Sequence, residues 1–178
     1  TWIATKRHDA DAYTVHQVIG WNLRRGRPVV ATSHGAPADA FWFSARPQLL
    51  AERRGPEVEA LIDRVEAAVA DYPYPQRYSA WPGPNSNTFT AFVARRVPEL
   101  GVDLPPTAIG KDWLPGRLVD RTPSGTGWQV SLYGLLGLSV GAAEGIEINL
   151  LGLNAGIDFD DLALRLPGLG RVGLPGAQ

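Results

Sequence analysis

The residues whose types and spacing could support chemistry are concentrated between Trp81 and Phe89, in the stretch WPGPNSNTF. Its two prolines favour extended backbone, whereas Asn85, Ser86 and Asn87 are all good N-cap residues for a helix. A serine in the first helical turn would lie at the positive end of the helix dipole, next to backbone N–H groups that could stabilise an oxyanion. Ser86 is therefore a candidate nucleophile. The alternative is that Ser86 and Asn85 only cap the helix.

A serine nucleophile needs a base, because the field of a helix terminus does not ionise a hydroxyl. The chain has three histidines, at positions 8, 16 and 34. His8 lies in a polar connection and is most simply a surface residue. His16 alternates with Val18 on a predicted strand and could point toward the junction or be a satisfied interior histidine. His34 follows a short strand where loops gather, and it is the one histidine that we favour as a substitute base.

A second group of candidates could bind a ligand or partner. Lys111, Asp112 and Trp113 follow one another in a proline-flanked loop and could form a binding edge. The alternative is an exposed ion pair beside an aromatic residue that fills the core. Trp81 and Asn87, on either side of the candidate nucleophile, complete the predicted binding residues.

Two helices and several strands must position these side chains. Phe89, Phe92, Val93 and Val97 recur at helical spacing, and Pro98 ends that helix. An apolar stripe from Val58 to Val69 predicts a second helix that starts at Pro56 and ends before Tyr72. Strands are expected at 1–5, 13–21, 28–33 and 76–80.

The C-terminal part of the chain predicts an antiparallel meander. Residues 131–141 and 146–156 align at an offset of 15, and both contain Leu-Leu-Gly-Leu. With 125–130 and 162–166 they suggest strands with glycine at the bends. No residue between Arg121 and Glu144 is charged. Because the apolar run is shorter than the ~20 residues of a membrane span, we expect a buried or partner-covered sheet.

Composition excludes several classes of function. A net charge of −1 gives no broad attraction to nucleic acid, and the absence of cysteine excludes disulfides and thiolate metal sites. No metal-binding spacing occurs in the sequence. Gly168–Gly173 matches the dinucleotide-binding pattern G-x-G-x-x-G, but no helix is expected after it, so we do not interpret it as a cofactor motif. We therefore expect neither metal nor cofactor. The chain contains no methionine, so a targeting or membrane-anchoring segment could precede Thr1.

Several motifs in order carry a resemblance to a known family. WIATK, YTVHQVIGW, WPGPNSNTF, PPTAIGKDWL and SGTGWQVSLYGLLGL resemble the uncharacterised bacterial family called domain of unknown function 3750, over nearly the whole chain. Longer members tend to carry an N-terminal hydrophobic segment, which implies the cell envelope. The family name implies no activity.

The chain also resembles, more distantly, permuted papain-like hydrolases and acyltransferases of the lecithin retinol acyltransferase type. Those enzymes place a histidine base on the first strand, a polar orienting residue on the next, and a cysteine at the start of a helix. Ser86 matches the cysteine position, after Asn85, and His16 falls near the orienting residue. The first-strand histidine would lie at or before Thr1, outside this chain.

Together these observations predict an α+β fold with a papain-like core over 1–116 and a β-meander over 117–178, packed on the same core. We expect a catalytically inactive binding domain of the bacterial envelope, on the periplasmic side, that contacts a protein or membrane complex through the meander and exposed aromatic residues. The alternative is a serine-dependent amidase, peptidase or acyl hydrolase. It would use Ser86 as nucleophile, His34 or a lost histidine as base, and His16 as orienting residue.

Overall fold

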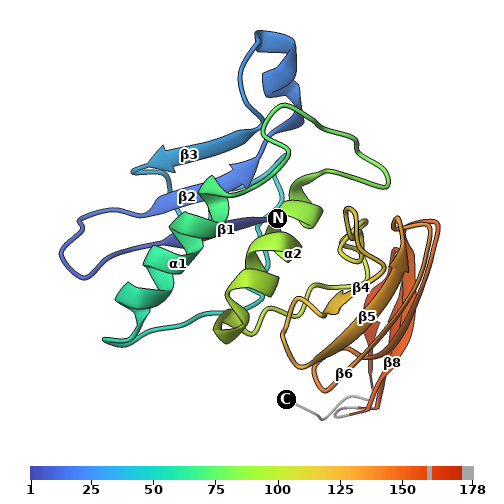
Figure 1. The fold of residues 1–178 in the computed structure, drawn as a ribbon. Coiled ribbons are helices and arrows are strands. Elements are labelled where there is room, and N and C mark those ends of the chain that lie inside the picture. Colours follow the sequence, from blue (N-terminus) through green and yellow to red (C-terminus); the bar gives the residue numbers. More distant parts are fainter. Residues whose placement is uncertain (160–161, 174–178) are drawn as a thin grey trace.

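A computed structural model describes residues 1–159 and 162–173 and contains two antiparallel sheets and two helices (Figure 1). The first sheet has the order β1-β2-β3, formed by Trp2–Thr5, Thr14–Val18 and Val30–His34. These strands match three of the predicted ones. The strand predicted at 76–80 is wrong. That segment is held by loop contacts instead, in which Ser79 N donates to Pro84 O at 2.8 Å.

The two predicted helices are α1, Val58–Ala70, and α2, Ser86–Arg96, and both lie on one face of this sheet (Figure 1). Phe89, Val93 and Val97 come from α2 and its C-terminal end, and all three are fully buried against Val65 of α1 and Val18 of β2. Short 3₁₀ turns follow β2 at Gly20–Arg25 and α2 at Pro98–Leu100. The apolar spacing of both helices thus forms the main core, as expected from helical periodicity.

The C-terminal sheet is a simple meander in which every strand pairs with its neighbour in sequence, in the order β10-β9-β8-β7-β6-β5-β4. Its strands are β4 Val119–Arg121, β5 Gly127–Leu132, β6 Leu136–Gly141, β7 Gly145–Leu150, β8 Leu153–Asp158, β9 Ala163–Leu166 and β10 Gly170–Val172. The predicted antiparallel meander is confirmed. Across the part of the chain that the structure describes, no helix is long and apolar enough to cross a bilayer.

The two Leu-Leu-Gly-Leu segments are not structurally equivalent, which corrects the predicted repeat. Gly152 lies in the turn between β7 and β8 with φ of 81°, a conformation that glycine adopts readily. Gly137 instead lies inside β6, where an added Cβ would approach Asp112 Oδ2 to 3.0 Å. The true counterpart of the Gly152 turn is Tyr133-Gly134, between β5 and β6.

The two faces of the meander are reversed relative to an ordinary half-buried sheet. Side chains that point toward the rest of the molecule are polar and buried, among them Gln129, Glu147, Asn154 and Arg165. The alternate residues are exposed, and apart from Arg121 on β4 the large ones are apolar. A water-exposed antiparallel sheet normally shows the opposite arrangement, with apolar residues inward and polar residues outward.

Candidate functional site

The N-terminus of α2 is capped by Asn85 alone. Its Oδ1 accepts hydrogen bonds from the backbone N of Asn87 at 2.9 Å and of Thr88 at 3.0 Å. Thr88 Oγ1 in turn accepts from the backbone N of Asn85 at 2.7 Å, which completes a capping box. Asn85 Nδ2 also donates to Ala80 O and Ile109 O. The helix therefore starts where the sequence predicts, and the cap is a buried part of the fold.

Ser86 is the first helical residue, and its partly buried hydroxyl has no hydrogen-bond partner among the described residues. Its backbone oxygen instead accepts from Thr90 Oγ1 at 3.1 Å and from Thr1 Oγ1 at 3.0 Å. Thr1 Oγ1 also lies 3.1 Å from Asn87 Oδ1. The start of β1 thus meets the first turn of α2, and Ser86 does not serve as the cap.

His16 and His34 line a separate cleft of about 520 Å³ between the first sheet and α1, together with Glu66. His16 Nδ1 lies 3.2 Å from Thr32 Oγ1, and its Nε2 lies 3.5 Å from Thr5 Oγ1. His34 Nδ1 lies 3.0 Å from Thr14 Oγ1. Burial lowers the pKa of His16, because its charged form loses hydration there.

The register of the sheet separates His34 from Ser86. Trp2 pairs with Gln17, so Thr1 and the adjoining Ser86 lie at the Val18 end of β2. His34 pairs with Thr14, at the opposite end of that strand. Four residues of strand span roughly 13 Å. The structure therefore brings the two histidines together, but it gives neither of them a hydrogen bond to Ser86. Their predicted catalytic roles stay predictions.

The predicted binding residues fall into two environments. Trp81 is half exposed and donates from Nε1 to Leu151 O at 2.7 Å, and Asn87 donates from Nδ2 to Ile109 O at 3.1 Å. Trp113 is partly buried against Tyr74, with ring centroids 5.3 Å apart. Lys111 and Asp112 are buried, at 4% and 3% exposure, which rules out the alternative of an exposed ion pair. Their predicted role in binding stays a prediction.

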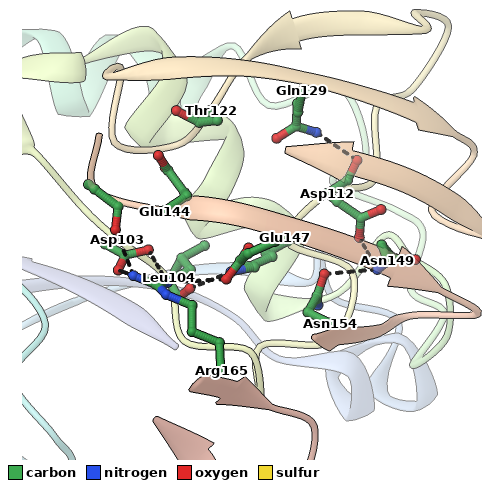
Figure 2. Close-up of polar contacts among 12 residues, drawn as sticks. Asp103, Leu104, Asp112, Thr122, Gln129, Glu144, Glu147, Asn149, Asn154 and Arg165 are labelled. Carbon is green, nitrogen blue, oxygen red and sulfur yellow. Dashed lines mark hydrogen bonds and ion pairs between the residues drawn. The ribbon is translucent and has the colours of Figure 1, made fainter. Parts of the chain in front are cut away.

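Lys111 belongs to a buried ionic network between the helical core and the meander. Figure 2 shows Asp103, Glu147 and Arg165 of this network. Lys111 Nζ lies 2.6 Å from Glu147 Oε2 and donates to Leu104 O at 2.6 Å. The other oxygen of Glu147 accepts from Arg165 at 3.1 Å. Arg165 also contacts Asp103 and Asp158. Burial acts to lower the pKa of Arg165, but these carboxylates outweigh it and raise the pKa overall.

Asp112 lies beside this ionic network, where its hydrogen-bond partners are uncharged side chains (Figure 2). Its side chain accepts from Asn149 Nδ2 at 2.7 Å and from Ser131 Oγ at 3.2 Å, and its backbone oxygen accepts from Gln129. Burial raises the pKa of Asp112. The adjoining cavity measures about 10 Å³, which is the space of one water molecule. This network holds the meander to the core and leaves no room for a substrate.

Within the described residues, no three His, Cys, Asp or Glu side chains are arranged to hold a metal ion. The remaining candidate is the outward face of the meander. We define the outer face as the outward-pointing large apolar side chains of the strands, each between 40% and 59% exposed. They are Val119, Trp128, Val130, Leu132, Leu136, Leu138, Val140, Ile146, Ile148, Leu150, Leu153, Ile157, Leu164 and Val172.

Fold and surface together define an α+β domain that carries a sheet with an exposed apolar face. The chain belongs to the family described as protein of unknown function (DUF3750), whose model matches residues 1–113. The first sheet, both helices and the loop up to Trp113 lie within the match, and the meander follows it. No curated protein and no solved structure matches this chain.

Proposed function

We propose that this protein is a non-catalytic binding domain of the bacterial cell envelope, and that its outer face contacts a partner protein or membrane complex. The papain-like ancestry of its core is part of this proposal. In this core, α2 packs on β1 and β2 with its N-terminus beside the start of β1. The observation that carries the proposal is the apolar composition of the outer face.

The outer face is larger than the largest apolar patch of an ordinary soluble monomer. Its half-exposed side chains together present on the order of 1,000 Å², whereas the largest apolar patch of a typical monomer is roughly 300–600 Å². An exposed apolar surface of this size is typical of an interaction site. The surface is also continuous, because its residues occupy neighbouring strands from β4 to β10.

The buried polar network on the inner side of the meander fixes the register of its strands and keeps the apolar side chains on the outer face. Shifting the register of a strand by one residue would turn its apolar residues inward and its polar residues outward. Such a shift would remove Glu147 and Arg165 from their ion pairs and Asn149 from Asp112. Breaking a buried ion pair is strongly destabilising, so the apolar residues remain outside.

Three observations favour an inactive domain over the serine hydrolase. Neither His16 nor His34 forms a hydrogen bond with Ser86. The cleft lined by the two histidines also lacks Ser86. In addition, Asn87 and Thr1, which adjoin Ser86, are engaged with each other. A serine nucleophile requires a base within hydrogen-bond reach.

A photo-crosslinking experiment in cells tests the proposed function. A photoreactive amino acid replaces Ile148 or Leu138 at the centre of the outer face, or Leu49, which is 73% exposed in the loop between β3 and α1. We expect a crosslinked product from positions 148 and 138, seen either as a larger protein band or as a covalent lipid adduct in mass spectrometry, and none from position 49. The absence of any product from both outer-face positions would contradict the proposal.

A further inference from the structure

We propose that the occupant of the outer face is the acyl-chain layer of a phospholipid bilayer, on which the meander lies flat without spanning it. This inference rests on the proposed function, because it names the partner of the same surface. It depends on how side chains of different types are distributed over the face, on its charge, and on the position of its backbone.

Aliphatic and aromatic residues occupy different zones of the surface. The outward residues of the central strands β6, β7 and β8 are leucine, isoleucine and valine, with the small Ala155 between them. Exposed aromatic residues lie on the β5 side of this centre and at the strand ends: Trp128 on β5, Tyr133 in the following turn, Phe159 after β8, and Trp81 against the β7–β8 turn. On the other side, β9 and β10 carry the aliphatic Leu164 and Val172. Aliphatic residues in the middle and tryptophan or tyrosine at the margin are typical of surfaces that enter a membrane interface.

The same zoning disfavours a protein partner. Specific protein interfaces place aromatic residues and arginine in their centres and form roughly ten hydrogen bonds. The centre of the outer face offers no polar side chain, and its backbone groups are paired within the sheet. The area of the outer face, on the order of 1,000 Å², would suffice for a stable protein interface, which needs about 800 Å² per partner. The outer face is therefore large enough to bind a protein, but its centre lacks the polar groups that would select a specific one.

Charge also favours an uncharged apolar medium. Among the described residues, the one outward charged side chain of the strands is Arg121, on the edge strand β4. Its guanidinium lies 4.0 Å from the centroid of the Trp128 ring. A cation stacked on tryptophan at the margin can reach the headgroups while the ring covers apolar surface. Burying the outer face in hydrocarbon would therefore place no charged side chain of its centre in the acyl layer.

The backbone of the sheet remains at the level of the headgroups in this arrangement. Strands β4 and β10 are the edges of the meander, and unpaired backbone groups at an edge are costly in hydrocarbon. If only the outward side chains enter the acyl layer, a depth of roughly 5 Å suffices and the edges stay hydrated. The charged inner network stays on the aqueous side.

Vesicle flotation with the whole chain tests this inference. The protein is mixed with vesicles of zwitterionic phosphatidylcholine at low and high salt and centrifuged through a density gradient. Because apolar burial drives the contact, we expect flotation that does not change with salt. The variant L138E/I148E should float at least about tenfold less, since each glutamate brings a charge toward the acyl chains. The matched control L49E should float like the wild type.

Both outer-face substitutions replace side chains that are about half exposed, and circular dichroism checks that the variant remains folded. Wild-type protein that stays out of the vesicle fraction would overturn the lipid inference. So would flotation that requires anionic lipid, disappears at high salt and is unchanged in L138E/I148E. If the wild type instead forms a dimer that L138E/I148E dissolves, a second copy is the occupant. In that case the lipid inference fails, whereas the proposed function stands.

Discussion

Lys111 and Glu147 form an ion pair that is almost fully withdrawn from water, with side chains 5% and 2% exposed. Two long charged side chains are rarely buried unless each is paired and hydrogen-bonded. Lys111 meets this condition through Glu147 and Leu104 O, and Glu147 through Lys111 and Arg165. The pair joins the loop after α2 to the middle of β7, so it fastens the two halves of the molecule.

We predict that Lys111→Met lowers the free energy of unfolding by about 3 kcal/mol, because it leaves part of the Glu147 charge uncompensated in the interior. Urea unfolding measures the change. Arg117→Met is the control, since Arg117 pairs with Asp120 at the surface and such pairs contribute about 1 kcal/mol or less. Equal effects of the two substitutions would show that the inner network does not stabilise the fold.

A second residue-scale prediction concerns pH. The pKa of His16 lies below its ordinary value of 6.5 because the side chain is buried. As the pH falls below about 6.5, the unfolded chain gains a proton at this position before the folded chain does. The contribution of His16 to stability is therefore complete above pH 6.5 and decreases as the pH falls.

We expect the wild type to lose more stability between pH 7.5 and pH 5.5 than His16→Gln, which cannot take up this proton. Urea unfolding at the two pH values measures the loss. His8→Gln, at a side chain that is 89% exposed, is the control and should behave like the wild type. A loss in His16→Gln that equals the wild-type loss would contradict the assignment.

At the scale of single elements, two adjacent polar residues at the start of α2 contribute differently to its stability. Asn85 makes the capping box and two further bonds to loops, whereas the Ser86 hydroxyl makes none among the described residues. We predict that Asn85→Ala costs about 2 kcal/mol of stability, at the upper end for an N-cap, and Ser86→Ala less than about 0.5 kcal/mol. Thermal unfolding of the two variants checks the difference.

The same pair of variants bears on the enzymatic alternative. A fluorophosphonate probe labels serines that a neighbouring base activates. We expect no labelling of the wild type, because the Nδ1 atoms of His16 and His34 lie within hydrogen-bond distance of threonine hydroxyls of the first sheet and neither histidine forms a hydrogen bond with Ser86. Labelling that disappears in Ser86→Ala but persists in Asn85→Ala would instead support a serine hydrolase.

The meander strands show how far an element can be predicted from its sequence. Alternation of apolar and polar residues along 127–132 and 145–150 indicates strands, and these strands are present. Alternation does not say which face points inward. Here the polar face is the buried one, because Asp103, Lys111 and Asp112 from the preceding loop supply its partners. Those partners are distant in sequence, so no local pattern reveals them.

At the scale of the whole molecule, the outer face predicts self-association in plain buffer. An exposed apolar patch on the order of 1,000 Å² favours nonspecific contact between copies. We expect the wild type to elute as heterogeneous large species without detergent, not as a dimer of defined mass, and as a monomer in mild detergent. The variant L138E/I148E should be monomeric in both, as measured by size-exclusion chromatography with light scattering. Monomeric wild type without detergent would argue against an exposed face of this kind.

The sequence by itself determines the local elements of this protein. Helical spacing and proline punctuation predict α1 and α2 to within a few residues, alternation helps to predict the first sheet, and apolar segments with glycine at the bends predict the meander. These features depend on neighbouring residues, so the chain encodes them locally.

Only the tertiary structure decides which polar residues meet and which face of the meander is exposed. It buries Lys111 and Asp112, directs His16 and His34 into one cleft away from the Ser86 hydroxyl, and leaves the leucines and isoleucines of the central strands in contact with the surroundings. The physical reason is that a buried charge must find its partner across the fold. Once the inner face is occupied by Glu147, Arg165 and their partners, the apolar side chains can only point outward.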